Sequence, residues 1–324
     1  MHHRVTPIAL LVTLGAVALA GCAATPAPAA SPSSDANAPV TVTNCGTDVT
    51  FEAAPERVVT IKSTSTEMLL ALGLGDRIVG TAFQDGPVPE QWEADATGLV
   101  SISDKVPSEE VVLETEPDLV YAGWESNFSP DGAGERAELA TLGVASYVSP
   151  SACQSAGQPE KLTFDDIFGD IQQVADIFRV DASELIAEQK QTLADIEATG
   201  DGRSALWFSS GSDTPYVGAG IGAPELVLET AGLTNIAGDL DATWAPFNWE
   251  AVVDADPDFI VLVDADWNTV EMKIAVLEAN PATANLTAVQ NKRYLIVPFA
   301  AGEAGVRSVD AAQSLAQQIT ELDG

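Results

Sequence analysis

Apolar and polar residues follow one another along this chain in a pattern that predicts strands alternating with helices. Short runs dominated by apolar residues read as buried strands. In the first half these runs are residues 57–61, 77–82, 119–122 and 144–148. Residues 68–72 read as a helix, because the capping-box pattern Thr64-x-x-Glu67 precedes them and Gly73 follows. Strands that alternate with helices favour parallel pairing, so the first half predicts a doubly wound α/β lobe.

The same alternation restarts after Gly200, which predicts a second lobe of the same kind. Its expected strands are residues 205–208, 259–263 and 293–297, and its expected helices are 223–231, 249–254, 270–278 and 306–322. Residues 41–51 read as a hairpin around an Asn/Gly-containing turn. We therefore expect an N-terminal lobe over 40–180 and a C-terminal lobe over 201–324. One continuous sheet is the alternative, and the polar stretch 150–159 counts against it.

The stretch between the two lobes, DASELIAEQKQTLADIEAT (Asp181–Thr199), predicts one amphipathic helix. Asp181 and Glu184 suit its first turn, and no glycine or proline interrupts it before Gly200. Such a helix would reach roughly 25 Å, about the width of a small domain. We expect residues 181–200 to link the lobes, and an ordinary surface helix is the alternative.

The N-terminal segment has the pattern of a secretory signal. Residues 1–21 combine a basic start, an apolar run and small residues, and they are too short to remain as a membrane span. Leu19-Ala20-Gly21-Cys22 resembles the bacterial lipobox, in which the cysteine receives a diacylglycerol. Residues 22–39, rich in Ala, Pro and Ser, would form a flexible tether. We expect an exported protein, lipid-anchored through Cys22 to the outer face of the cytoplasmic membrane; an ordinary signal with an accidental cysteine is the alternative.

Charge and histidine content exclude several classes of function. The formal net charge of -34 repels polyanions at long range, which disfavours nucleic acid as a partner. Both histidines, His2 and His3, lie in the predicted signal. A mature chain without imidazole cannot form a Ser-His-Asp or Cys-His nucleophile system, and it lacks the usual nitrogen ligand of transition metals. No calcium-loop pattern stands among its acidic residues, so we expect no metal site and no cofactor.

One sequence unit occurs once in each predicted lobe. Residues 108–120 (SEEVVLETEPDLV) and 248–260 (NWEAVVDADPDFI) place Glu110 and Glu250 at the same position before a Pro-Asp pair that opens a buried strand. A single unit of this kind is a common way to enter a strand. Its recurrence on either side of a linking helix indicates that one building block serves both lobes.

With this repeat, the chain resembles the solute-binding proteins of ABC importers that carry ferric siderophores, haem and cobalamin, which hold two α/β lobes on one stiff helix (class III). The resemblance covers roughly residues 55–319 and is most specific at 55–59 (PERVV), at 66–73 (TEMLLALG) and in the two repeated units. It implies a non-catalytic carrier whose Glu110 and Glu250 meet arginines of an ABC permease dimer with its ATPase. For either glutamate alone, a solvated helix charge is the alternative.

The resemblance also places the ligand between the lobes, against the loops that follow the strands. Those loops supply flat faces for a planar ligand from Trp124, Tyr216, Trp244, Trp267 and Phe299. They also supply Lys62 and Arg307, candidates for holding a carboxylate, a phosphate or an anionic chelate. Packing within a lobe is the alternative for each aromatic side chain, and a neighbouring carboxylate is the alternative partner for Arg307.

Because the mature chain lacks histidine, it resembles the chelate-binding branch of the family rather than relatives that bind bare zinc or manganese. Residues 121–127 (YAGWESN) and 210–222 resemble loops of actinobacterial members proposed to import a deazaflavin phospholactate, the precursor of coenzyme F(420). The expected ligand is this deazaflavin precursor, with a ferric siderophore close behind and haem or cobalamin as further alternatives.

Two cysteines, Cys45 and Cys153, remain once Cys22 is lipidated. In an exported protein we expect them to form a disulfide, and two free buried thiols are the alternative.

Two other functions stay open from the sequence. An exported enzyme could use paired loop carboxylates from Asp104, Glu125, Asp213 or Glu303, although no spacing singles out a pair. A cell-surface sensing or adhesion module would not need both Glu110 and Glu250. We expect a monomer in each case.

Overall fold

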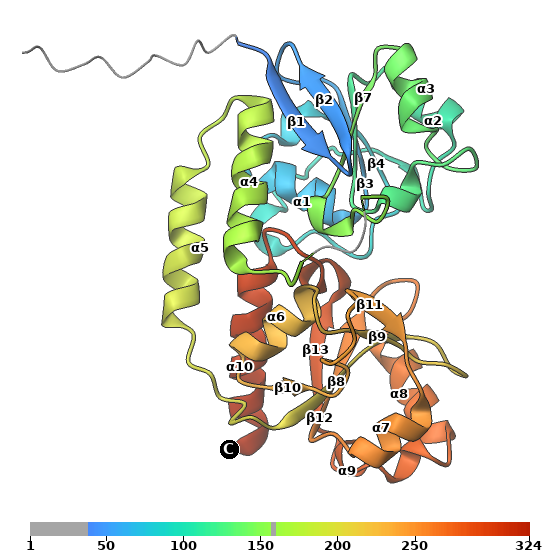
Figure 1. Cartoon of the computed structure of the whole chain (residues 1–324), viewed down its shortest axis with the longest axis vertical. Helices are drawn as coiled ribbons and strands as arrows, with labels where there is room; N and C mark the ends of the chain where they lie inside the picture. The colour runs from blue at the N-terminus through green and yellow to red at the C-terminus, as the bar shows by residue number, and fades with distance from the viewer. Residues whose placement is uncertain (1–37, 157–159) are drawn as a thin grey trace, which may run out of the picture. The chain divides into compact units, whose positions relative to one another are not determined.

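The computed structural model describes residues 38–156 and 160–324 and resolves two α/β lobes, each built on its own sheet (Figure 1). The predicted signal and the lipidation site Cys22 lie outside the described residues. The largest hydrophobic cluster runs without a break from the N-terminal lobe, through Val58 and Leu119, into the C-terminal lobe at Val261 and Leu315. The two-lobed α/β architecture predicted from the alternating pattern is confirmed.

The N-terminal sheet is parallel throughout, with strand order β5-β4-β3-β6-β7. Its strands are β3 (Val58–Ile61), β4 (Ile78–Ala82), β5 (Ser101–Ser103), β6 (Leu119–Ala122) and β7 (Ala145–Val148). Its helices are α1 (Ser63–Ala71), α2 (Glu109–Leu113), α3 (Arg136–Thr141) and α4 (Phe164–Phe178). The strand order reverses between β3 and β6, and the loops after these two strands therefore diverge and leave room for a ligand.

The C-terminal sheet is mixed. Parallel strands β8 (Ser204–Ser210), β12 (Phe259–Asp264) and β13 (Tyr294–Pro298) form its centre, with β10 (Thr234–Asn235) beside β8. Strands β9 (Tyr216–Gly218) and β11 (Trp244–Pro246) extend one edge in antiparallel fashion. The helices are α6 (Ala223–Thr230), α7 (Trp249–Ala255), α8 (Val270–Ala279), α9 (Thr287–Gln290) and α10 (Ser308–Asp323). The short strands β5, β9, β10 and β11 were absent from the prediction.

The linking helix is shorter than predicted. Helix α5 covers Ser183–Asp195, because the Asp181 carboxylate accepts a hydrogen bond from Ser183 N at 2.9 Å and so starts the helix two residues late. At the other end, the chain bonds the C-terminal lobe instead of continuing the helix. Thr199 Oγ1 donates to Ala316 O at 2.7 Å, and Gly200 N donates to Ala231 O at 2.9 Å.

Helices α4 and α5 together make the connection between the lobes. In Figure 1, α4 runs up the side of the N-terminal lobe and α5 returns along its outer side to reach α10. Apolar side chains of α5, including Leu185 and Leu193, pack against the continuous core. Gln189 Nε2 donates to Val306 O at 2.8 Å, which ties α5 to the C-terminal lobe. No helix in residues 38–156 and 160–324 is long and apolar enough to cross a membrane.

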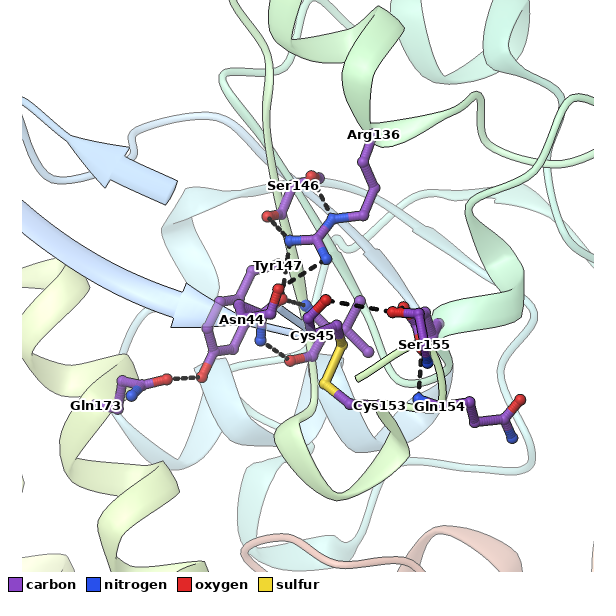
Figure 2. The surroundings of a disulfide bond; sticks show 11 residues. Asn44, Cys45, Arg136, Ser146, Tyr147, Cys153, Gln154, Ser155 and Gln173 are labelled. Atoms are coloured by element: carbon purple, nitrogen blue, oxygen red, sulfur yellow. Dashed lines mark hydrogen bonds between the residues drawn. A yellow bond between two sulfur atoms is a disulfide. The ribbon is translucent and has the colours of Figure 1, made fainter. Parts of the chain in front are cut away.

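The N-terminal hairpin, β1 (Val40–Asn44) and β2 (Thr47–Phe51), is fastened to the end of β7 (Figure 2). Its tight turn places Cys45 and Gly46 at positive φ values of 50° and 74°. Asn44 accepts from Val148 N at 2.9 Å and donates to Val148 O at 2.8 Å, as a neighbouring strand would. A disulfide joins Cys45 to Cys153, the pair expected from the cysteine content.

Candidate ligand-binding cleft

A cavity of about 680 Å³ opens between the lobes, at the carboxyl ends of the strands of both sheets. Loops after β3, β6 and β7 line it from the N-terminal lobe, and loops after β8, β12 and β13 line it from the C-terminal lobe. This volume is in the range of pockets for ligands larger than a bare ion. The cavity lies at the switch point of the N-terminal sheet, where the fold leaves an opening.

Five aromatic side chains predicted to face the ligand are brought together in its lining, namely Trp124, Tyr216, Trp244, Trp267 and Phe299. Phe299 is the hub. Its ring centroid lies 6.4 Å from the nearly parallel ring of Trp244, and 5.9 and 5.3 Å from the tilted rings of Trp124 and Trp267. Tyr216 extends the parallel series, 6.5 Å from Trp244. Tyr216 and Trp267 are each 42% exposed, so their faces are open to an incoming molecule.

Lys62, a predicted ligand contact, lies behind this aromatic wall. Its side chain is fully buried and forms an ion pair with Asp85, which is also buried. Its Nζ atom lies 4.0 Å from the ring centroid of Trp124 and 4.7 Å from that of Phe299. Lys62 is also the residue before α1 and has a φ of 80°, a value unusual for a side chain with a Cβ atom. The structure therefore offers no open ammonium group at this position.

Arg307, the other predicted cation, is bound to a carboxylate. Its Nη1 atom lies 3.2 Å from Oε1 of Glu67, and its side chain is 16% exposed. The sequence had suggested Glu67 as a capping-box residue of α1, and that interpretation is wrong. The helix begins at Ser63, before the predicted cap Thr64, and Glu67 bonds Arg307 of the C-terminal lobe instead. Burial raises the pKa of Glu67 to about 7, although Arg307 opposes this shift.

Glu303 contributes a carboxyl group to the cavity lining. Thr64 Oγ1 donates to its Oε2 at 2.6 Å, and Trp124 Nε1 donates to its Oε1 at 2.5 Å. Burial raises the pKa of Glu303 to about 7, while the nearby Lys62 ammonium lowers it and Asp85 raises it further. The two hydrogen bonds fix the carboxyl plane at the floor of the cleft.

Glu125 holds the segment that follows Cys153 in place at one side of the cavity. Its carboxylate accepts from Gln154 N at 2.5 Å and from Ser155 N at 2.9 Å, and also from Ser155 Oγ. The pKa of Glu125 lies below its usual range, because these hydrogen bonds outweigh the opposing effect of burial. Cys153 and Gln154 themselves line the cavity, and in Figure 2 the disulfide ties this segment to the hairpin turn. Hairpin, disulfide and Glu125 together position one side of the cleft.

Several hydrogen bonds and one ion pair cross from lobe to lobe beside the cavity, and we call them the junction contacts. They are Asp266 N to Asp85 O at 3.0 Å, Trp267 Nε1 to Asp85 Oδ1 at 3.4 Å, Thr64 and Trp124 to Glu303, and Arg307 to Glu67. Asp85 was not singled out from the sequence. Its signal was modest: an acidic residue that follows a buried strand in a loop at the ligand edge.

Glu110 and Glu250, the predicted docking residues, occupy matching places outside the cavity lining. Each is exposed and is the second residue of its helix, α2 or α7. Residues Glu116 and Asp256, each just before the proline of the unit, adopt left-handed backbone with φ of 50° and 40°. The repeat seen in the sequence is therefore a repeat in backbone conformation.

The aspartate of each Pro-Asp pair explains why the unit recurs. Asp118 accepts hydrogen bonds from Glu56 N and Arg57 N, just before β3. Asp258 accepts from Ser204 N at the start of β8. Each aspartate thereby anchors the first residues of a central strand and fixes how the glutamate-bearing helix sits on its lobe.

Two carboxylates considered for catalysis, Asp104 and Asp213, are exposed and do not line the cavity, whereas Glu125 and Glu303 do. No group of three or more His, Cys, Asp or Glu residues that could hold a metal ion occurs in the described parts of the chain.

Comparisons with known proteins agree with this geometry. An uncharacterised ABC transporter substrate-binding lipoprotein of Bacillus subtilis, YvrC, is 26% identical over 321 residues, which is 94% of each chain. The vitamin B12-binding protein of Pectobacterium carotovorum is 24% identical over 279 residues, covering 83% of this chain and 90% of the relative. The crystal structure of an ABC-type Fe3+-hydroxamate transport system from Saccharomonospora viridis is 30% identical, with a TM-score of 0.75 over 88% of this chain and 99% of that one.

A family model described as periplasmic binding protein matches residues 58–301, which include both sheets and the connecting helices. The relatives are solute-binding proteins and not enzymes, so the enzyme alternative does not hold. By its sequence and by its two-lobed fold, the chain belongs to the periplasmic binding protein family.

Proposed function

We propose that this protein is the extracytoplasmic substrate-binding component of an ABC importer, and that it captures a metal chelate or a planar cofactor in the cleft between its lobes. The observation that carries the proposal is the aromatic cavity at the strand ends of both lobes. Its volume and its lining suit a ligand with a broad flat face. The Bacillus subtilis relative, similar over nearly the whole chain, bears the name of such a component.

The same cavity supports two candidate ligands, a ferric chelate and a deazaflavin phospholactate. The Pectobacterium relative is named for binding vitamin B12 and the Saccharomonospora structure for Fe3+-hydroxamate transport, which supports a chelate. The deazaflavin precursor, the first expectation from the sequence, now comes second, and its flat ring system suits the series Tyr216, Trp244 and Phe299.

Glu110 and Glu250 are proposed to dock on the two permease subunits. Both are exposed, and both hold the same position on equivalent helices of the two lobes. Two like charges held at a fixed separation by one folded unit can meet two arginines at little cost in conformational entropy. Cys22 is proposed to carry the lipid that keeps the protein near the permease.

A ligand screen tests the binding part. The mature chain with Cys22→Ser is mixed with ferric hydroxamates, cobalamin, haem and a deazaflavin phospholactate, and tryptophan quenching is recorded. Trp124, Trp244 and Trp267 all line the cleft, so saturable quenching by one ligand class without turnover is expected. Absence of saturable binding by every ligand would contradict the chelate-or-cofactor proposal.

A transport assay tests the docking part. Glu110→Lys and Glu250→Lys are expected to lower uptake by cells at least about tenfold, since like charges then face each other across the interface, while ligand affinity stays unchanged. Glu188→Lys, on the exposed side of α5, is the matched control and should transport normally. Normal uptake by both docking variants would favour a cell-surface sensing module instead.

A further inference from the structure

The charged groups that line the cleft are acidic. Glu125, Glu160 and Glu303 are among its lining residues. Of the lining residues within 38–156 and 160–324, none is lysine, arginine or histidine. Serine and threonine hydroxyls and the five aromatic side chains make up much of the remaining lining. An anionic ligand would thus enter a cavity that offers it hydroxyl groups but no opposite charge.

The cations nearest the cleft have partners of their own. Lys62 is paired with Asp85 and Arg307 with Glu67, as described above. The Lys62–Asp85 pair is buried behind the aromatic side chains. Around the junction, these two cations face three carboxyl groups once Glu303 is included. With all three carboxyl groups ionised, the balance of charge at the floor of the cleft is negative. Protonation of either Glu303 or Glu67, whose pKa values burial raises to about 7, makes it neutral.

Two further cations border the lining segments. Lys161 follows the lining residue Glu160, and its Nζ lies 2.7 Å from Glu229 and 3.5 Å from Glu225. Arg136 donates hydrogen bonds to Asn44 and Ser146 behind the Glu125 segment. Neither residue is part of the cavity lining, and the charged group of each is engaged by these partners.

We propose that the cleft selects its ligand by charge and takes a molecule that carries positive charge beside a flat or apolar face. Aromatic faces attract a cation through the ring quadrupole, and the attraction grows when water is excluded. Glu303 lies among these rings and is fixed by Thr64 and Trp124, so it is placed to receive the positive group. An anion would lose its hydration in the cleft without gaining a charged partner. This inference deepens the proposed function and rests on the cleft being the ligand site. It counts against the deazaflavin phospholactate, which is an anion, and favours a cationic chelate.

Two series of probes that differ only in charge test the inference. The first is one linear ferric trihydroxamate with a free terminal amine, with that amine acetylated, and with that amine succinylated, which gives a cation, a neutral chelate and an anion. The second is a flat pair of similar size, N-methylquinolinium and quinoline-2-carboxylate. Dissociation constants are measured with the full mature chain by calorimetry at pH 8. We expect the cation to bind at least about tenfold more tightly than the anion, which corresponds to about 1.4 kcal/mol.

The variant Glu303→Gln shows which group provides the preference. It keeps a side chain of the same shape and is expected to lower cation affinity severalfold while neutral-chelate affinity stays the same, with folding checked by thermal unfolding. Wild-type cation affinity should also fall as the pH drops from 8 to 6, because protonation removes the charge of Glu303. This dependence should be weaker in Glu303→Gln, where only the more distant Glu67 still titrates in that range. Glu188→Gln, outside the cleft, serves as the control.

The outcomes separate the two proposals. Equal or tighter binding of the anion in either series overturns charge selection even if the chelates bind well. Binding of the flat cation but of no chelate supports charge selection and contradicts the chelate assignment. Failure of both series at millimolar concentration overturns the inference, since a cleft of this composition must retain a flat cation at least weakly.

Discussion

Replacing Lys62 with methionine distinguishes a structural role at the lobe junction from a ligand contact. Methionine keeps the apolar stem but removes the ammonium group, which leaves Asp85 buried, at 2% exposure, without its ion-pair partner. Breaking a buried ion pair from one side costs about 3–5 kcal/mol, because the remaining charge is still desolvated. The Phe83, Trp124 and Phe299 rings, whose centroids lie 4.2, 4.0 and 4.7 Å from Nζ, lose their cation–π contacts too. We expect Lys62→Met to lower the free energy of unfolding by about that amount.

Urea unfolding followed by tryptophan fluorescence measures this loss. The double variant Lys62→Met/Asp85→Asn should be less destabilised than Lys62→Met alone, because it leaves no unpaired charge. Lys105→Met, at an exposed position, is the control and should change stability by no more than about 0.5 kcal/mol. The reasoning is refuted if Lys62→Met unfolds at the wild-type urea concentration but binds the ligand weakly; Lys62 would then be the ligand contact first expected from the sequence.

Three other perturbations have expected outcomes. The double variant Cys45→Ser/Cys153→Ser removes the disulfide, which spans a sequence separation of 108, and should lower the free energy of unfolding in urea by about 3–5 kcal/mol. Ligand binding should also weaken, because Cys153 lines the cleft. Unchanged stability would contradict this. The folded pKa values of Glu67 and Glu303, about 7, lie above the ordinary 4.5, so the folded state holds protons that the unfolded state releases. Their contribution to stability should fall as the pH rises from 4.5 to 7, and a double Gln variant should flatten this slope in thermal unfolding. Thr163→Ala removes the hydroxyl that caps α4 and should cost about 1 kcal/mol, whereas Thr163→Ser should be nearly neutral; equal losses in the two variants would argue against the cap.

The parts of the fold that the sequence predicted are those in which a local pattern and the tertiary structure agree. Buried parallel strands such as 119–122 are covered on both faces, so their apolar runs are visible in the chain itself. Strands β9 and β11 could not be found in this way. Each is three residues long. β9 forms by pairing with the edge of β8, and β11 by pairing with β9, rather than through any apolar period of their own.

The candidate site shows the same division. Its aromatic members could be predicted because they follow strands whose carboxyl ends meet at one edge. The ion-pair partners of its charged residues could not be predicted. Lys62 meets Asp85, and Arg307 meets Glu67, only after segments that are distant in the sequence fold together. Composition suggested that rare cations serve the ligand. The structure instead pairs them with carboxylates, because a buried cation without a partner is too costly.

The junction contacts have a consequence for the kinetics of ligand exchange. All of them bridge the same two lobes, and they flank one cavity, so a motion that separates the lobes breaks them together rather than one by one. At about 1 kcal/mol each, their combined loss would slow spontaneous opening by a factor of roughly several thousand. The residence time of a bound molecule would then depend on the protein's own lobe-to-lobe bonds as much as on its contacts with the ligand. A docked permease that pulls on both lobes could therefore shorten that time without touching the cargo.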